Sequence, residues 1–215
     1  PRVLGAALAG TDAHLVHVGS AAEYGAPANG LALAENTRCT PTSAYGVSKL
    51  EGTRGALAQL PTATILRPFN VIDADLPRES PLIDIYQRIK AAVRCNRPVR
   101  LISEITTRDY VSRKFVIASI AIAVRIRPAG VFNICSGIGV TTGEIVRMVL
   151  TDWGLQDSLE SLGGDDSCIV GDPTKWTELT GFHCSLDTRG IVDTLHWTDS
   201  MHCPPSPGSS GDTHG

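Results

Sequence analysis

Two short apolar runs, separated by a segment of helix length, constrain the fold of this chain more than any other feature. Residues 15–18 (Leu-Val-His-Val) end at Gly19-Ser20, and residues 63–66 (Ala-Thr-Ile-Leu) end at Arg67-Pro68. Apolar runs of this length are typical of buried strands. A helix of about 16 residues is expected between them, starting near Ser43. Strand, helix and strand in this order predict a parallel sheet with ligands bound where its strands end.

The rest of the chain continues the alternation of helices and strands. It predicts further helices over 83–93, 112–126, 141–153 and 185–195, strands over 99–102 and 131–135, and a helix with Asp172 as N-cap and Pro173 at its first position. Thr141 and Glu144 have the spacing of a capping box. Loops are expected over 26–42 and 71–82. This pattern is typical of an α/β protein with a mostly parallel sheet.

The pentapeptide Tyr45-Gly46-Val47-Ser48-Lys49 places a phenol and an ammonium group four residues apart. On a helix these two residues share a face. A positive charge beside a phenol favours the phenolate, so the pair suits proton exchange with a carbonyl or carbinol oxygen. A Tyr-x-x-x-Lys pair alone is usually a solvated surface pair. Because Ser20 stands at a predicted strand end and could hydrogen-bond the same oxygen, we interpret the three residues as a site for hydride transfer involving a nicotinamide.

Seven stretches resemble the extended short-chain dehydrogenase/reductase family of NAD-dependent nucleotide-sugar epimerases, dehydratases and reductases. They occur in family order from Arg2 to about Trp197: VHVGSAAEYG, PTSAYGVSK, LRPFN, TRDYV, VFNICSGIGVTTGEIV, VGDPTK and LTGF. Residues 19–25 and 135–139 are most similar to the Gly-Ser-Ser-Glu-Glu-Tyr-Gly strand end and the Cys-Ser-Gly-Ile-Gly turn of GDP-4-keto-6-deoxy-D-mannose reductases.

This resemblance implies a Rossmann-like, doubly wound parallel sheet, N-terminally incomplete, with a small C-terminal substrate lobe. The implied boundaries are 1–198 for the partial dinucleotide-binding domain, with the lobe interleaved at about 71–107 and 137–186. Residues 199–215 are expected to form a disordered tail because of their Pro, Gly and Ser content. The implied cofactor is NAD or NADP, and the implied partner is a nucleotide-sugar.

The resemblance also implies catalytic roles. Tyr45 is expected to donate the proton to the carbonyl oxygen during reduction, and Ser20 to polarise that oxygen. Lys49 is expected to support Tyr45 and to hold the nicotinamide ribose, so that Tyr45 and Lys49 also belong to the cofactor site.

Four more residues match binding positions of the family. Arg67 and Pro68 resemble the motif whose backbone borders the nicotinamide. Asn70 resembles the asparagine that contacts substrate, and Arg108 resembles the arginine that binds the nucleotide diphosphate, for which a planar guanidinium is well shaped. Structural roles remain open for each: Arg67 as a buried support, Asn70 as a turn residue, and Arg108 in an ion pair with Asp109. Tyr24 is expected to pack rather than to react.

The glycine-rich turn of the family is not found in this sequence. Family members begin with a strand, a Gly-x-x-Gly-x-x-Gly turn and a helix, whose N-terminus binds the dinucleotide pyrophosphate. The candidates at residues 5–10, 137–139 and 163–164 do not have this spacing between a strand and a helix. Against the family layout, Pro1 is expected to lie in the helix before the fourth strand, with roughly 70–90 residues missing. The alternative is therefore a cofactor-free pseudoenzyme or truncated fragment that acts only as a binding or structural protein.

The residues after Ser20 bear on the type of reaction. Dehydratases of the family have Asp-Glu or Ser-Glu there, whereas this chain has Ala21 and Ala22, which cannot transfer a proton. Elimination of water is disfavoured, and 4-keto reduction or epimerisation is expected. The family's glycine-containing turn and two aspartates are replaced at residues 72–77, Ser112 and Phe115. These departures suggest relaxed constraint and favour the alternative.

Composition excludes other classes of function. The net charge is −3 and the arginines over 88–100 are spread along a predicted helix and its exit, so no nucleic acid partner is expected. The longest apolar run, 115–124, is too short to cross a bilayer, so no membrane association is expected. The six cysteines lack metal-binding spacing and are expected to be free thiols in a cytoplasmic protein. The family resemblance also implies that the chain forms a homodimer through the helix that bears Tyr45.

Overall fold

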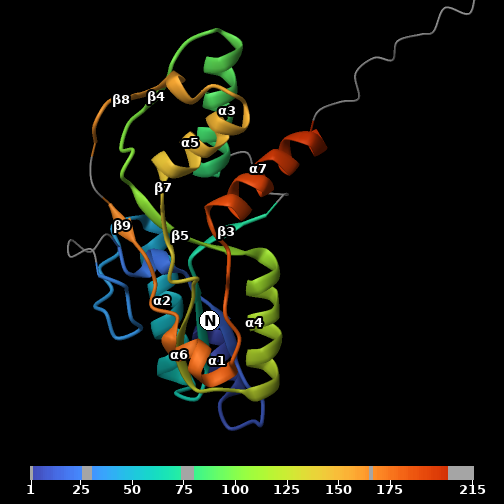
Figure 1. The fold of residues 1–215 in the computed structure, drawn as a ribbon. Helices are drawn as coiled ribbons and strands as arrows, with labels where there is room; N and C mark the ends of the chain where they lie inside the picture. The colour runs from blue at the N-terminus through green and yellow to red at the C-terminus, as the bar shows by residue number, and fades with distance from the viewer. Residues whose placement is uncertain (1, 26–30, 74–79, 165–166, 203–215) are drawn as a thin grey trace, which may run out of the picture.

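The computed structural model describes residues 2–25, 31–73, 80–164 and 167–202 (Figure 1). Its helices and strands are, in chain order, α1 (Arg2–Leu8), β1 (Val16–Val18), α2 (Ala44–Gln59), β2 (Thr64–Pro68), β3 (Asn70–Ile72), α3 (Pro81–Arg94), β4 (Val99–Leu101), β5 (Thr107–Ser112), α4 (Arg113–Ile126), β6 (Gly130–Ile134), β7 (Gly139–Thr141), α5 (Thr142–Asp152), β8 (Leu159–Ser161), β9 (Cys168–Ile169), α6 (Thr174–Thr180) and α7 (Thr188–His202). Two 3-10 turns, η1 (Ala21–Glu23) and η2 (Gln156–Ser158), complete the set.

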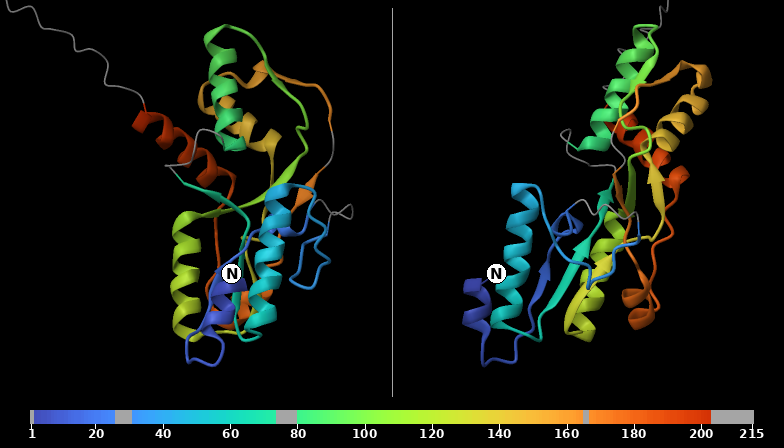
Figure 2. Two further views of the ribbon diagram at one scale, coloured as in Figure 1. Left: turned by 180° about the vertical axis from the view of Figure 1, so that it is seen from behind. Right: turned by 90° about the vertical axis from the view of Figure 1, so that its left-hand side faces the viewer.

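A parallel sheet with the order β1-β2-β6 holds the candidate site. β1 pairs with Thr64–Leu66 of β2, and β2 pairs with all of β6. Every residue of β2 is buried. Helices α1 and α2 cover one face of this sheet and α4 covers the other (Figure 2). The predicted α/β, Rossmann-like class is confirmed, because parallel strands covered by helices on both faces are its defining arrangement.

A smaller lobe is built on α3, α5, α7 and the parallel pair β4-β8 (Figure 1). Its core joins residues far apart in sequence, among them Tyr86, Ile89, Val99, Val149 and Val192. The strands β3, β5, β7 and β9 form a second sheet between this lobe and the β1-β2-β6 sheet. Chain segments therefore pass between the two parts several times.

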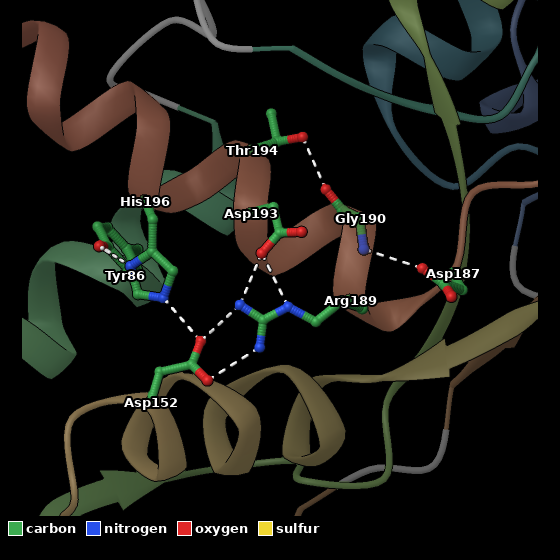
Figure 3. A network of polar contacts seen from close by, with 8 residues as sticks. All are labelled: Tyr86, Asp152, Asp187, Arg189, Gly190, Asp193, Thr194 and His196. Atoms are coloured by element: carbon green, nitrogen blue, oxygen red, sulfur yellow. Dashed lines mark hydrogen bonds and ion pairs between the residues drawn. The ribbon is translucent and has the colours of Figure 1, made fainter.

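A polar network fastens α7 to α3 and α5 on the lobe surface (Figure 3). Arg189 donates two hydrogen bonds of 2.9 Å to the carboxylate of Asp152 and two more to Asp193. His196 lies between Asp152 and Tyr86, with its Nε2 3.1 Å from Asp152 and its Nδ1 3.0 Å from the Tyr86 hydroxyl. The Asp152 carboxylate thus joins α5 to α7, and His196 joins α7 to α3.

Several helix starts match their predictions. Ser43 caps α2 by accepting a hydrogen bond from the Gly46 amide at 3.0 Å. Thr141 and Glu144 form both halves of the predicted capping box of α5. The start of α6 was predicted one residue too early. Its N-cap is Pro173 rather than Asp172, although the Asp172 carboxylate still accepts a hydrogen bond from the Thr174 amide.

Other predictions differ from the structure. The final helix continues to His202, so residues 199–202 of the predicted disordered tail are helical, while 203–215 lie outside the described residues. The parts of the predicted loops at 26–30 and 74–79 also lie outside them. The predicted loop over 71–82 was wrong at both ends, because residues 71–72 belong to β3 and residues 81–82 to α3. Strands β3, β5, β7, β8 and β9 were missed, because they are short or, like β5 with Thr107-Arg108-Asp109, interrupted by polar residues.

Three expectations about other sites can be compared with the described part of the chain. Within it, Cys39, Cys95, Cys135, Cys168 and Cys184 are free thiols, and Cys203 lies outside it. No group of His, Cys, Asp and Glu side chains in the described ranges is arranged to hold a metal ion. None of the described helices combines the length and the apolar character needed to cross a bilayer.

Candidate active site

Tyr45 and Lys49 lie on one face of the first turns of α2. The ammonium nitrogen of Lys49 is 5.7 Å from the centroid of the Tyr45 ring. The Tyr45 side chain is 58 % exposed, so its hydroxyl is accessible to a ligand. The predicted pairing of a phenol and an ammonium group on one helical face is confirmed.

Lys49 also reaches the end of the neighbouring strand β1. Its Nζ donates a hydrogen bond of 3.2 Å to the carbonyl oxygen of Val18, two residues before Ser20. The first turn of α2 packs directly against η1, since a Cβ atom built at Gly46 would lie only 2.4 Å from the Ala22 carbonyl oxygen. Only glycine allows this approach. The structure therefore brings Ser20 to the helix turn that bears Tyr45 and Lys49.

Ser20 forms the N-cap of η1. Its Oγ accepts a hydrogen bond of 3.1 Å from the Ala22 amide, and its own amide donates one of 3.1 Å to Glu23 Oε1. Ser20 Oγ acts as an acceptor in this contact, so its hydroxyl proton remains for a bond to a ligand oxygen. The side chain is half-buried at the carboxyl end of β1.

The Arg67 side chain has a structural role rather than a ligand-facing one. It is buried, and its Nε donates a hydrogen bond of 2.9 Å to Glu23 Oε2. Its guanidinium carbon lies 4.8 Å from the centroid of the Tyr24 ring. The alternative raised for Arg67, a buried support, describes its side chain. The backbone contact expected of Arg67 and Pro68 with a nicotinamide stays a prediction.

Tyr24 is fully buried behind the strand end. Its hydroxyl donates a hydrogen bond of 2.7 Å to Asn133 Oδ1 on β6. Burial raises the pKa of Tyr24 to about 12. The phenol therefore stays protonated at neutral pH, which agrees with the expected packing role.

Asn70 and Arg108 line one pocket of about 380 Å³ between α3, β3 and β5. The same pocket is lined by Val71, Ser80, Pro81, Leu82, Ile85, Thr106, Tyr110 and Thr142. Asn70 is the first residue of β3, two residues after the end of β2, and Ser20 lies two residues after the end of the neighbouring strand β1. Both residues therefore lie at the carboxyl edge of the parallel sheet. The two predicted substrate-binding residues are thus brought together by the fold.

The hydrogen bonds of these two residues are to the backbone. Asn70 Nδ2 donates to the Asp109 carbonyl oxygen at 2.8 Å, so the residue does satisfy a backbone group as the alternative for it supposed. Arg108 Nη1 donates to the carbonyl oxygens of Thr107 and Ser167 at 2.8 and 2.9 Å. These bonds orient the guanidinium, and most of its five N–H groups remain for an anion in the pocket.

The ion pair between Arg108 and Asp109, considered as an alternative, does not form in the described structure. Asp109 points the opposite way and is fully buried. Its Oδ1 accepts from the amide and hydroxyl of Ser136, and its Oδ2 accepts from the amides of Gly137 and Gly171. Burial raises the pKa of Asp109, against the lowering effect of these hydrogen bonds. The carboxylate of Asp109 thus anchors the segments around Ser136 and Gly171 to β5. The sequence analysis missed this anchor because the hydrogen-bond donors are 27 to 62 residues away from Asp109.

A model of the NAD dependent epimerase/dehydratase family matches residues 2–135, more than half of the chain. The chain belongs to this family. Among its relatives is a dTDP-6-deoxy-L-talose 4-dehydrogenase (NAD(P)(+)) from Kitasatospora kifunensis, which is 26 % identical over 193 residues. That alignment covers 86 % of this chain and 58 % of the relative.

Solved structures of other enzymes share the fold of this epimerase/dehydratase chain. The Bordetella bronchiseptica enzyme WbmG, solved with NAD and UDP, has a TM-score of 0.76 and 25 % identity, over 93 % of this chain and 64 % of WbmG. A dTDP-glucose 4,6-dehydratase from Bacillus anthracis, solved with NAD, has a TM-score of 0.74 and 20 % identity, over 87 % and 62 %. The chain thus spans less than two thirds of the length of these relatives.

Proposed function

We propose that this chain carries the proton-transfer site and the substrate lobe of an NAD(P)-dependent sugar-nucleotide oxidoreductase. The observation that supports this most is the contact of Lys49 with the end of β1, which sets Tyr45 and Lys49 beside Ser20. The names of two relatives, a dTDP-6-deoxy-L-talose 4-dehydrogenase and a dTDP-glucose 4,6-dehydratase, support the same class of chemistry. The reaction proposed is 4-keto reduction or epimerisation.

In the reduction, Tyr45 donates its phenolic proton to the carbonyl oxygen of the sugar, which becomes a hydroxyl. A nicotinamide, when bound, supplies the hydride to the carbonyl carbon in this direction and accepts it in the reverse direction. The Ser20 hydroxyl donates a hydrogen bond to the same oxygen and stabilises the negative charge that develops there. Lys49, with its Nζ 5.7 Å from the centroid of the Tyr45 ring, is proposed to support Tyr45 and to hold the nicotinamide ribose.

The residues present fit the nicotinamide end of a dinucleotide. Tyr45 is exposed, and Lys49 has an ammonium group with donors to spare beyond its bond to Val18, as a ribose hydroxyl requires. The phosphate-binding glycine turn is not in this sequence. The backbone of Arg67 and Pro68 is proposed to border the nicotinamide.

The pocket of Asn70 and Arg108 is proposed to hold the nucleoside diphosphate. Both residues line the pocket. Arg108 supplies a planar, charged donor for phosphate oxygens, and Asn70 is proposed to contact the sugar. Within this class, the GSAAEYG and CSGIG segments favour a GDP-4-keto-6-deoxy-D-mannose reductase-like substrate. Ala21 and Ala22 carry no acid or base, which disfavours a dehydratase reaction.

The experiment that tests this proposal is titration calorimetry of the purified chain with NADH and NADPH. Turnover of 4-keto sugar nucleotides is then followed at 340 nm. Tyr45→Phe is expected to lower turnover about 10²-fold or more, because it removes the acid. The second candidate is a cofactor-free pseudoenzyme. A folded chain that binds a sugar nucleotide but neither dinucleotide would support it.

A further inference from the structure

Glu23 places a fully buried carboxylate directly behind the candidate active site. It follows Ser20 by three residues and its side chain has no exposed surface. Oε1 accepts hydrogen bonds from the Ser20 amide at 3.1 Å and from the Thr53 hydroxyl at 2.9 Å. Oε2 accepts from Arg67 Nε at 2.9 Å. A buried charge with three donors is stabilised only while these donors keep their places.

The three donors belong to the three elements that meet at the site. Ser20 lies two residues after β1, Thr53 lies on α2 two turns after Tyr45, and Arg67 lies on β2. The carboxylate also occupies the side-chain space of Gly19, because a Cβ atom built there would lie 2.2 Å from Glu23 Oε1. One side chain therefore connects the serine strand end with the tyrosine helix.

Arg67, which donates to Glu23, is itself fixed by buried neighbours. Arg67 lies over the Tyr24 ring, and the Tyr24 hydroxyl is bonded to Asn133 on β6. Asn133 in turn donates to the Leu33 carbonyl oxygen at 2.7 Å. A fully satisfied buried network of this kind has one low-energy arrangement, so it resists displacement of any member.

We propose that Glu23 is a positioning residue of the active site, which holds Ser20 at a set place relative to Tyr45 by joining β1 to α2. Glu23 has no exposed surface and does not touch a ligand. Its effect on catalysis rests on the proposed function, whereas its effect on the position of Ser20 does not.

The test needs variants that remove the connection and still fold. Replacing both members of the buried pair, in Glu23→Leu with Arg67→Met, leaves no unpaired buried charge, and such replacements are often neutral for stability. Thr53→Val is milder and removes only the bond between α2 and Glu23. Thr64→Val is the matched control, because Thr64 is also a buried threonine whose hydroxyl donates a hydrogen bond. Thr64 lies at the other end of β2, and its acceptor is the carbonyl oxygen of Pro128 rather than Glu23.

The first readout is hydrogen exchange, which does not depend on activity. In the Glu23→Leu/Arg67→Met variant the Ser20 amide is expected to exchange about tenfold faster than in the wild type, because its acceptor is gone. In Thr53→Val the exchange of the 19–24 segment is expected to rise severalfold. Thr64→Val is expected to leave this segment unchanged. Equal exchange in Thr64→Val and the Glu23 variant would overturn the proposal.

The second readout separates binding from catalysis. If the wild type is active, kcat is expected to fall about tenfold in Thr53→Val, with the dinucleotide Kd unchanged in that variant, and to fall further in the double variant. Faster exchange at Ser20 without a fall in kcat would refute a positioning role. If the wild type neither binds a dinucleotide nor turns over, the proposed function fails, and the exchange experiment still decides whether Glu23 holds Ser20.

Discussion

Lys49 Nζ lies 3.2 Å from the Val18 carbonyl oxygen, to which it donates a hydrogen bond. The bond joins the tyrosine helix to the strand that ends at Ser20, across 31 residues of sequence. A lysine that already has one backbone acceptor is restrained in position, so less side-chain entropy is lost when it binds a further ligand group.

Lys49→Met is expected to weaken dinucleotide binding about tenfold, because a hydrogen bond to a charged group contributes roughly 1.5–3 kcal/mol. Calorimetric titration with NADH and NADPH measures this. The matched control is Lys175→Met, since Lys175 donates a similar bond to the Val131 carbonyl oxygen at the start of β6, away from the site. Equal affinity in both variants would show that Lys49 only fastens α2 to β1.

Arg108→Lys is expected to weaken binding of GDP, UDP or dTDP about tenfold. Lysine keeps the charge but loses the planar fork that matches a diphosphate. The comparison variant is Arg100→Lys, an exposed arginine on β4 paired with Glu160. Fluorescence or calorimetric titration of each nucleotide distinguishes the two. An unchanged affinity in Arg108→Lys would remove Arg108 from the binding site.

Asp109→Asn is expected to lower the free energy of unfolding by about 1–3 kcal/mol. The asparagine oxygen can replace Oδ1 beside Ser136, but its NH₂ group would face the amides of Gly137 and Gly171, which are donors themselves. Urea denaturation measures the change. Asp84, which forms an exposed ion pair with Arg88, offers a control, because Asp84→Asn should change the free energy of unfolding by less than about 0.5 kcal/mol. Equal stability of the two variants would contradict the anchor role.

Stability should depend on acid pH through Asp152. The Arg189 guanidinium, followed by His196, holds the pKa of Asp152 below its ordinary value. Its folded-state pKa is thus below its unfolded-state pKa. The resulting stabilisation is complete above the unfolded pKa, about 3.9, and is lost as the pH falls through the folded pKa.

Asp152→Asn should therefore be less stable than the wild type at pH 7, and the difference should close as the pH falls below about 4. Urea denaturation at a series of pH values follows this. Glu51→Gln, which removes an exposed ion pair with Arg54 on α2, should show a much smaller difference at pH 7. If the difference in the free energy of unfolding between the wild type and Asp152→Asn stays constant from pH 7 to pH 3, the prediction is refuted.

We expect the chain to form a homodimer through α1 and α2. Val3 on α1 is 85 % exposed and Leu4 is 51 % exposed, and α1 lies against α2. Exposed apolar patches of this kind mark association surfaces. Light scattering after gel filtration should show a dimer that becomes a monomer in Val3→Glu/Leu4→Glu. If Ile117→Glu/Val124→Glu on α4 dissociates it instead, the interface lies on the opposite face.

The sequence was most informative where its signals are local. The βαβ unit around Tyr45, the Ser43 cap and the Thr141–Glu144 capping box depend on residues within one helix or strand, and each is found in the structure. The Tyr45–Lys49 spacing belongs to the same class, because helical geometry alone places them on one face. The family resemblance added Asn70 and Arg108 to the candidate residues and gave Ser20 its expected role.

Sequence by itself therefore determined the fold class, the helix that bears Tyr45 and the chemistry of the candidate residues. Only the tertiary structure decided how they are held: Arg67 turned inward to Glu23, Asp109 turned away from Arg108, and β5 paired with three strands. The physical reason is that a buried charge takes whichever donors folding brings to it. Apart from the Ser20 amide, those donors come from positions 27 to 62 residues away, which no local pattern of residues encodes.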